Sequence, residues 1–134
     1  IAKELKADPY SGTSVGTKPF MAPEQIMGRS EKRSDLWALG VLMYQLYTGS
    51  LPFYDEIEKE MMEKILEAEP VLPREYNEGI APAIEAVILK LLQKDPDRRY
   101  QSARDLSAEL KQLFDSSAVR RGGEKGGQGA AQDR

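Results

Sequence analysis

The feature that most constrains the fold of this chain is an apolar run at residues 34–49. It reads SDLWALGVLMYQLYTG and is apolar at nearly every position between Asp35 and Gly49. Ser34 or Asp35 is suited to cap the start of a helix, and Gly49 to end it in the left-handed conformation. Because a helix without a polar face must be surrounded by protein, the run predicts one central buried helix.

The composition excludes several classes of function. The chain holds no Cys and no His, which excludes Cys/His zinc sites, Cys nucleophiles, His general bases and disulfides. A formal net charge of −3 argues against a nucleic-acid-binding domain, which carries a basic face. The longest apolar run, residues 36–46, is shorter than the roughly 20 residues of a membrane-spanning helix.

The two ends of the chain lack the pattern of a packed core. Residues 1–33 are rich in Gly, Ser, Thr and Pro, and they predict a long loop with a short helix at about 23–27. Residues 115–134 are rich in Gly and have no apolar stripe, which predicts a disordered tail or linker. We therefore expect the domain to span residues 1–114, as a long polar loop followed by packed helices, and the tail to lie outside it.

Three later segments carry apolar side chains at helical spacing. They are residues 55–69, residues 82–94 and residues 102–114. The first also carries seven acidic residues, the second opens with Pro82, and the third opens with a capping pattern at Ser102 and Asp105. These segments predict a mainly α domain and, by themselves, no function.

Four short motifs follow one another along the chain. They are Ala22-Pro23-Glu24, Asp35-Leu36-Trp37-Ala38-Leu39-Gly40, Leu51-Pro52-Phe53 and Asp95-Pro96-Asp97-Arg98-Arg99. In order and spacing they resemble the A-P-E, the D-x-W-x-x-G, the following L-P-F and the D-P-x-x-R of serine/threonine protein kinases, bacterial in style. The resemblance covers about residues 1–114 and implies the helical subdomain of the kinase C-terminal lobe, preceded by the activation-segment loop.

The resemblance also implies what this segment lacks. Ile1-Ala2-Lys3 is similar to the residues that follow D-F-G, and the chain contains no G-x-G-x-x-G, V-A-I-K, H-R-D or D-F-G. The implied parent is a two-lobed α+β enzyme that uses ATP and Mg²⁺ to phosphorylate Ser or Thr of protein substrates. Its N-terminal lobe and catalytic loop would lie upstream, so we expect no catalytic residue and no metal ligand here, and an inactive fragment.

The resemblance assigns the P+1 loop, which contacts the substrate beside the phosphorylated residue, to Gly16, Thr17, Lys18, Pro19 and Phe20. Thr17 would support the absent catalytic Asp, although a turn Thr in a Gly-Thr pair is the plain alternative. Phe20 stands where the family usually has Tyr. Thr13 and Ser14 are candidates for activating phosphorylation, which adds close to two negative charges; an ordinary exposed loop is the alternative.

The remaining assignments are structural. Glu24 and Arg99 are expected to form a buried ion pair rather than a weak surface pair. Asp35 is expected to cap its helix and, in the parent, to anchor the catalytic loop. Trp37 and Gly40 complete the same motif. Leu42 and Leu46 match positions beneath the adenine pocket, and in this fragment we expect them to be core.

Two alternatives stay open at this point. The parent can be a non-catalytic kinase-like scaffold, or the segment can be a helical protein-binding module. The acidic helix at 55–69 is a candidate docking surface for a basic partner, although a solvated polar face is the simpler interpretation. We expect a cytoplasmic protein with no nucleic-acid partner and no membrane span in this segment, and the sequence leaves open an anchor beyond the tail.

Overall fold

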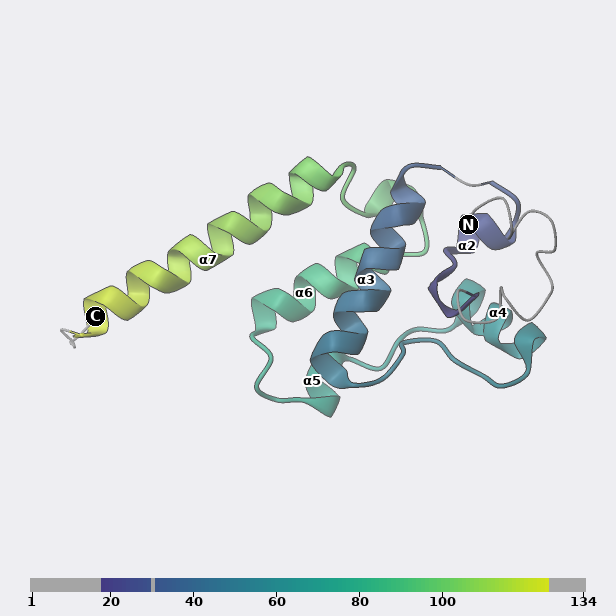
Figure 1. The fold of residues 1–134 in the computed structure, drawn as a ribbon, viewed down its shortest axis with the longest axis horizontal. Coiled ribbons are helices and arrows are strands. Elements are labelled where there is room, and N and C mark those ends of the chain that lie inside the picture. The colour runs from purple at the N-terminus through teal and green to yellow at the C-terminus, as the bar shows by residue number, and fades with distance from the viewer. Residues whose placement is uncertain (1–17, 30, 126–134) are drawn as a thin grey trace. The chain divides into compact units, whose positions relative to one another are not determined.

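The computed structural model of this protein describes residues 18–29 and 31–125. The described part is helical and contains no strand, which confirms the predicted mainly α fold (Figure 1). The chain divides into two compact units, Ile1–Gln101 and Ser102–Arg134. The elements in chain order are the 3₁₀-helix η2 (Lys18–Phe20), α2 (Pro23–Ile26), α3 (Arg33–Thr48), α4 (Glu58–Glu67), α5 (Pro73–Tyr76), α6 (Pro82–Leu91), the 3₁₀-helix η3 (Pro96–Arg98) and α7 (Ala103–Lys125).

The central helix α3 ends where the sequence predicts but starts earlier. Gly49 ends it with a φ of 80°, in the left-handed region that glycine adopts without strain. The predicted capping by Ser34 or Asp35 is wrong, because the helix begins at Arg33 and Lys32 occupies the cap position without a side-chain cap. The Ser34 hydroxyl instead accepts from the backbone N–H of Glu31 at 3.3 Å.

One side of α3 forms the centre of the core of the first unit. Its buried side chains include Trp37, Val41 and Tyr44, and the helix lies against α6, α5 and η2 (Figure 1). Gly40 lies at the crossing with α6: a Cβ at this position would lie 2.7 Å from the Cβ of Leu91. The absence of a side chain at Gly40 therefore allows the two helices to approach this closely.

The helix α4 follows its predicted stripe except at the first position. Met61 and Ile65 are buried, and the helix contacts α2. Ile57 also lies at the helical spacing predicted for residues 55–69, but it is 57% exposed and stands at the cap position before the first turn. An apolar residue at the spacing of the stripe is exposed here because it precedes the helix and does not share its face.

The helix α6 agrees with its pattern, whereas α5 was not predicted. Val87, Ile88 and Leu91 of α6 are buried, as the spacing required. Pro73 occupies the first turn of α5, where its missing N–H costs nothing. A helix of four residues is too short to show a stripe in the sequence.

The second unit consists of α7 over its described length. The Ser102 hydroxyl accepts from the backbone N–H of Asp105 at 3.1 Å, which is the predicted cap. The helix continues to Lys125, past residue 115 where the predicted tail begins. Helical hydrogen bonds propagate without an apolar face, so the end of the stripe at Phe114 did not mark the end of the helix. Residues 126–134 of the predicted tail lie outside the described residues.

Within the described ranges, no helix has both the length and the apolar character that crossing a bilayer requires.

Candidate functional site

A buried ion pair joins Glu24 at the start of α2 to Arg99 after η3. The guanidinium donates to the two carboxylate oxygens at 2.8 and 2.7 Å, a bidentate arrangement. Glu24 is 7% exposed and Arg99 is 2% exposed. The structure thus brings together the two residues that the sequence paired across 75 positions.

The remaining donors of Arg99 are also satisfied. Its Nε donates to the carbonyl of Gln93 at 2.7 Å, and its two terminal nitrogens reach the carbonyls of Arg33 at 2.8 Å and Lys94 at 3.3 Å. With the two bonds to Glu24, all five guanidinium N–H groups have partners. Arg99 therefore connects α2, the start of α3 and the segment after α6.

The carboxylate of Glu24 is held in its charged form. Burial alone raises the pKa of Glu24, but the hydrogen bonds from Arg99 and from the Ser34 hydroxyl, at 2.7 Å, outweigh burial and leave the pKa below its usual value. In a buried pair whose hydrogen bonds are all made, these bonds and the attraction between the charges offset the free-energy cost of desolvation. Loss of one partner leaves the other charge buried and unpaired, which is strongly destabilising.

The four sequence motifs meet in one continuous cluster. Arg99 lies 5.2 Å from the ring centre of Trp37, and Trp37 stacks on Phe53 with centroids 5.7 Å apart and planes inclined by 14°. Glu24 belongs to the first motif, Trp37 to the second, Phe53 to the third and Arg99 to the last. We name the cluster formed by Glu24, Arg99, Trp37 and Phe53 the motif cluster.

The segment before α2 is anchored on this core. Pro19 is buried, and Phe20 is half-buried and packs on the apolar core. The N–H of Ala22 donates to the side-chain oxygen of Gln25 at 2.8 Å, which fixes the entry of the chain into α2. The other predicted loop residues, Gly16, Thr17, Thr13 and Ser14, lie outside the described residues, as does the side chain of Lys18.

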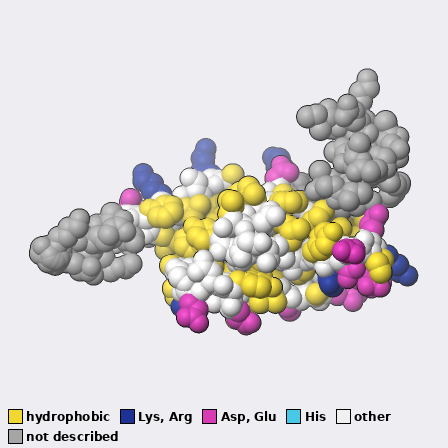
Figure 2. Space-filling model, turned by 60° about the horizontal axis from the view of Figure 1, so that its bottom comes forward, with side chains coloured by type: hydrophobic (Ala, Val, Ile, Leu, Met, Phe, Trp, Pro, Cys, Tyr) yellow, Lys and Arg dark blue, Asp and Glu magenta, His cyan; other side chains and the backbone are white. Residues whose placement is uncertain are grey.

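A second face of α3 is uncovered in the described part of the chain. Asp35 is exposed at its start, and Leu42 and Leu46 are 42% and 73% exposed. The expectation that the two leucines are core is therefore wrong, because the buried residues of α3, such as Trp37, Val41 and Tyr44, lie on the opposite side of the helix. Figure 2 shows hydrophobic side chains at the surface, in patches interrupted by other side chains and by backbone.

Arg33 organises a polar cluster that the sequence did not indicate. Its guanidinium donates to Glu31 at 2.6 Å, and to Asp97 and Gln101 at 2.7 Å each. Hydrogen bonds from Arg33 lower the pKa of Glu31. The cluster is exposed, so its contribution to stability is small. Arg33 and Asp97 are 64 positions apart, so no local sequence pattern indicates that they pair.

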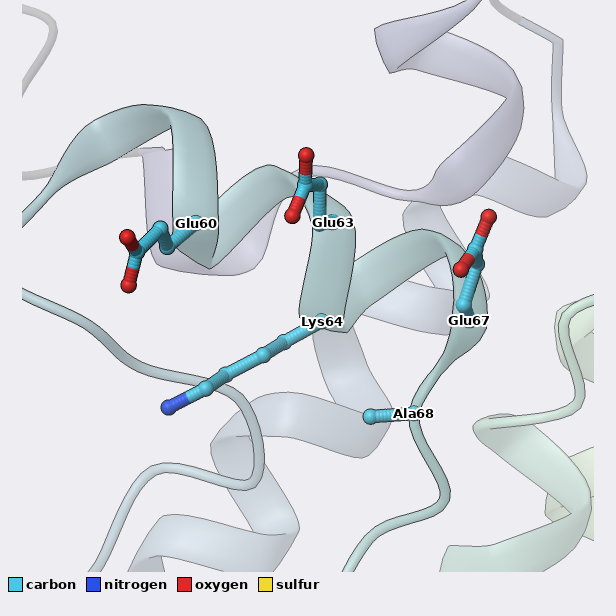
Figure 3. Close-up of a pocket in the computed structure, with 5 residues that line it drawn as sticks. All are labelled: Glu60, Glu63, Lys64, Glu67 and Ala68. Carbon is cyan, nitrogen blue, oxygen red and sulfur yellow. The ribbon is translucent and has the colours of Figure 1, made fainter.

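The acidic helix α4 borders an open groove of about 320 Å³ (Figure 3). Its lining residues are Glu60, Glu63, Lys64, Glu67 and Ala68. Lys64 extends away from Glu63 and Glu67 in Figure 3, and it bonds the carbonyl of Tyr54 at 2.9 Å and the carboxylate of Asp55 at 3.3 Å. The groove therefore presents carboxylates to solvent.

None of the acidic side chains that the structure describes group closely enough to hold a metal ion.

The family of the protein follows from its comparison with known proteins. The model of the protein kinase domain matches residues 1–111. Because the match covers most of the chain, this protein belongs to the protein kinase family.

Its relatives include bacterial serine/threonine-protein kinases. The chain is 34% identical to PrkC of Bacillus subtilis over 82% of its length, 36% identical to PknB of Mycobacterium leprae over 72%, and 35% identical to PksC of Streptomyces coelicolor over 74%. These alignments cover 17%, 16% and 18% of the respective relatives. The chain thus spans about a sixth of the length of the relatives it matches.

Proposed function

We propose that this chain is the C-terminal-lobe segment of an enzyme that transfers the γ-phosphoryl group of ATP to Ser or Thr of protein substrates. The family membership and the names of its relatives support this activity. In this proposal ATP and Mg²⁺ bind to residues outside the segment, and Mg²⁺ neutralises charge on the phosphates when bound. The residues of this chain act by positioning.

The observation that carries the proposal is the uncovered face of α3. Asp35, Leu42 and Leu46 lie on the side of the helix that the described residues leave exposed. A carboxylate followed by two apolar side chains suits a surface that receives another part of a larger domain, since exposed apolar area is costly in water. We assign Asp35 to anchoring the catalytic loop, and the two leucines to supporting the residues beneath the adenine ring.

The substrate-facing part of the proposal concerns the segment before α2. Residues 16–20 would form the P+1 loop, with Thr17 supporting the catalytic Asp and with Thr13 or Ser14 as the phosphorylated residue. Its support is the anchoring of Pro19 and Phe20 on the core next to the motif cluster. A loop held at its end by packing is suited to present its preceding residues in one geometry.

A phosphotransfer assay on the full gene product tests the proposal. The protein is incubated with γ-labelled ATP, Mg²⁺ and a generic protein substrate, and label on Ser and Thr is measured with and without EDTA. We expect Mg²⁺-dependent transfer by the full product and no transfer by the 134-residue chain alone. Asp35→Asn should lower the rate on the order of 10²-fold, as misplaced catalytic groups do.

Glu56→Gln is the matched control, since it also removes one exposed carboxylate from the first unit and should leave the rate unchanged. A folded full product that transfers no phosphate would refute the enzymatic proposal and favour a kinase-like scaffold. Transfer by the short chain alone would refute the inactivity of the segment. We also propose a cytoplasmic location, where ATP is available; cell fractionation tests this.

A further inference from the structure

Lys94 has an environment that differs from those of the other described lysines. Its side chain is half-buried, and its Nζ lies 4.2 Å from the ring centre of Phe53 and 5.5 Å from that of Trp37. The amine donates to the carbonyl of Ile65, in the last turn of α4, at 2.6 Å. Lys94 therefore lies between α4 and the motif cluster, with two aromatic rings and a carbonyl around its amine.

The amine of Lys94 has no carboxylate within ion-pair distance in the described part of the chain. Glu69, on the segment after α4, favours the charged form from a greater distance. The neighbouring cation is Arg99, whose own charge is matched by Glu24. Lys64 of α4, in contrast, pairs with Asp55.

This environment makes the ammonium form of Lys94 less favourable than that of an exposed lysine. Desolvation by burial lowers the pKa of Lys94 to about 8, although Glu69 opposes the shift. The rings attract a cation, but a cation–π contact is worth only about 0.5–2 kcal/mol and does not replace a lost hydration shell. An amine that is partly neutral near pH 8 is a nucleophile, as desolvated lysines in apolar pockets are.

We propose that Lys94 is an acyl-acceptor site, modified at its Nζ by small activated acyl donors of the acyl phosphate or thioester class. The neutral amine attacks the acyl carbon, an amide C–N bond forms, and the bond from the acyl carbon to oxygen or sulfur breaks. With acetyl phosphate, the amine proton leaves with the phosphate as HPO₄²⁻. No oxidant or metal takes part.

The product suits the position of Lys94. An amide is neutral, so it avoids the desolvation that disfavours the ammonium. It retains one N–H, which can donate to the carbonyl of Ile65, while the acyl methyl group is apolar like the faces of Phe53 and Trp37. A product with a negative charge would instead meet the negative faces of the two rings.

Competitive acetylation of the unmodified protein tests the proposal without a substitution. The chain is treated with limiting acetyl phosphate, and in a second arm with a small acetyl thioester, from pH 6.5 to 10.5. Peptide mass spectrometry then gives the relative rate at each lysine, with the exposed Lys59 of α4 as internal reference.

At pH 8 about half of an amine with a pKa of about 8 is neutral, compared with about 0.4% of an ordinary lysine, so the reactive fraction is roughly a hundredfold larger. A less basic amine is also a weaker nucleophile. With the dependence known for thiolates, this weaker nucleophilicity lowers the rate roughly tenfold. We therefore expect Lys94 to react about tenfold faster than Lys59 at pH 8 and to level off above pH 9.

Two variants sharpen the result. Glu69→Gln removes the carboxylate that favours the ammonium, so it should increase the rate at Lys94 at pH 7. Glu60→Gln removes an exposed carboxylate from the acidic groove and should leave that rate unchanged. Reaction with only one of the two donors supports the site and identifies its source of acyl groups. A rate at Lys94 no higher than at Lys59, or one that keeps rising to pH 10.5, overturns the proposal.

Discussion

Replacing Arg99 by alanine removes a buried side chain that donates five hydrogen bonds to described residues. The substitution deletes two hydrogen bonds to Glu24 and three to backbone carbonyls, of Gln93, Arg33 and Lys94. It also removes the guanidinium that lies 5.2 Å from the ring centre of Trp37. What remains is a carboxylate that is 7% exposed and retains the Ser34 hydroxyl as a donor.

The expected loss of stability is large. Breaking a buried pair by removing one partner costs about 3–5 kcal/mol, because the remaining charge stays buried without its partner. The free energy of unfolding of a small domain is about 5–15 kcal/mol, so the loss is a substantial part of the total. For a domain of this size the melting temperature should fall on the order of 10–30 °C.

Urea denaturation followed by circular dichroism measures the change, and the variant should shift the midpoint without changing the slope. Arg98→Ala is the matched control: Arg98 is the adjacent residue and is exposed, so its loss should change the free energy of unfolding by less than about 0.5 kcal/mol. A double variant, Glu24→Gln with Arg99→Met, should recover part of the loss, since it removes the unpaired charge. If the free energy of unfolding of Arg99→Ala lies within about 0.5 kcal/mol of that of the unmutated protein, as expected for Arg98→Ala, the buried-pair reasoning is refuted.

Three further outcomes follow from the same contacts. The pKa of Glu24 in the folded protein lies below its ordinary value of 4.5. The Glu24–Arg99 pair should therefore stabilise the fold fully above about pH 5, and this stabilisation should be lost as the pH falls through the lowered pKa. The free energy of unfolding measured against pH, for the unmutated protein and for Glu24→Gln, tests this. Gly40→Ala should cost about 1–3 kcal/mol in urea denaturation, because the new Cβ would lie 2.7 Å from that of Leu91. Tyr44→Phe should cost about 1 kcal/mol in thermal denaturation, because the Tyr44 hydroxyl donates to the carbonyl of Val71 at 2.7 Å.

The helices that the sequence predicted well are those with a long apolar stripe or a strong terminal residue. Gly49 marked the end of α3, Pro82 the start of α6 and Ser102 the start of α7. The cap of α3 was mispredicted because a Ser or Asp at the right place can serve another partner. Ser34 donates to Glu24, a contact that depends on the tertiary fold.

The exposure of Leu42 and Leu46 shows where helical periodicity reaches its limit. An all-apolar helix indicates that protein surrounds it, but not which part of the protein does so. The described residues cover one side of α3 and leave these two leucines in solvent. The apolar pattern therefore predicts that both sides of α3 are covered, whereas the described residues cover only one of them.

The candidate site also has one part that the sequence predicted and one part that it did not. The pairing of Glu24 with Arg99 came from the resemblance, and the structure contains it. The environment of Lys94 could not be predicted, because it depends on the placement of Phe53, Trp37 and the end of α4 around one amine. Lys94 precedes Asp95 and Pro96, and nothing in this local sequence indicates that its side chain is half-buried. Its contacts with the rings of Trp37 and Phe53 arise only when the core is packed.

The motif cluster also explains why four short motifs, weak when taken singly, specify one arrangement when taken together. Glu24 contacts Arg99, Arg99 lies near Trp37, and Trp37 stacks on Phe53. Each contact joins residues from different motifs, so a change in one motif alters the burial or the charge balance of the next. Substitutions in the cluster should therefore be non-additive, as is usual for residues that share partners. The combination Phe53→Leu with Arg99→Ala should cost less than the sum of the single changes. The combination Phe53→Leu with Ser102→Ala should be additive, because the Ser102 hydroxyl bonds Asp105 within α7 and Ser102 does not belong to the motif cluster.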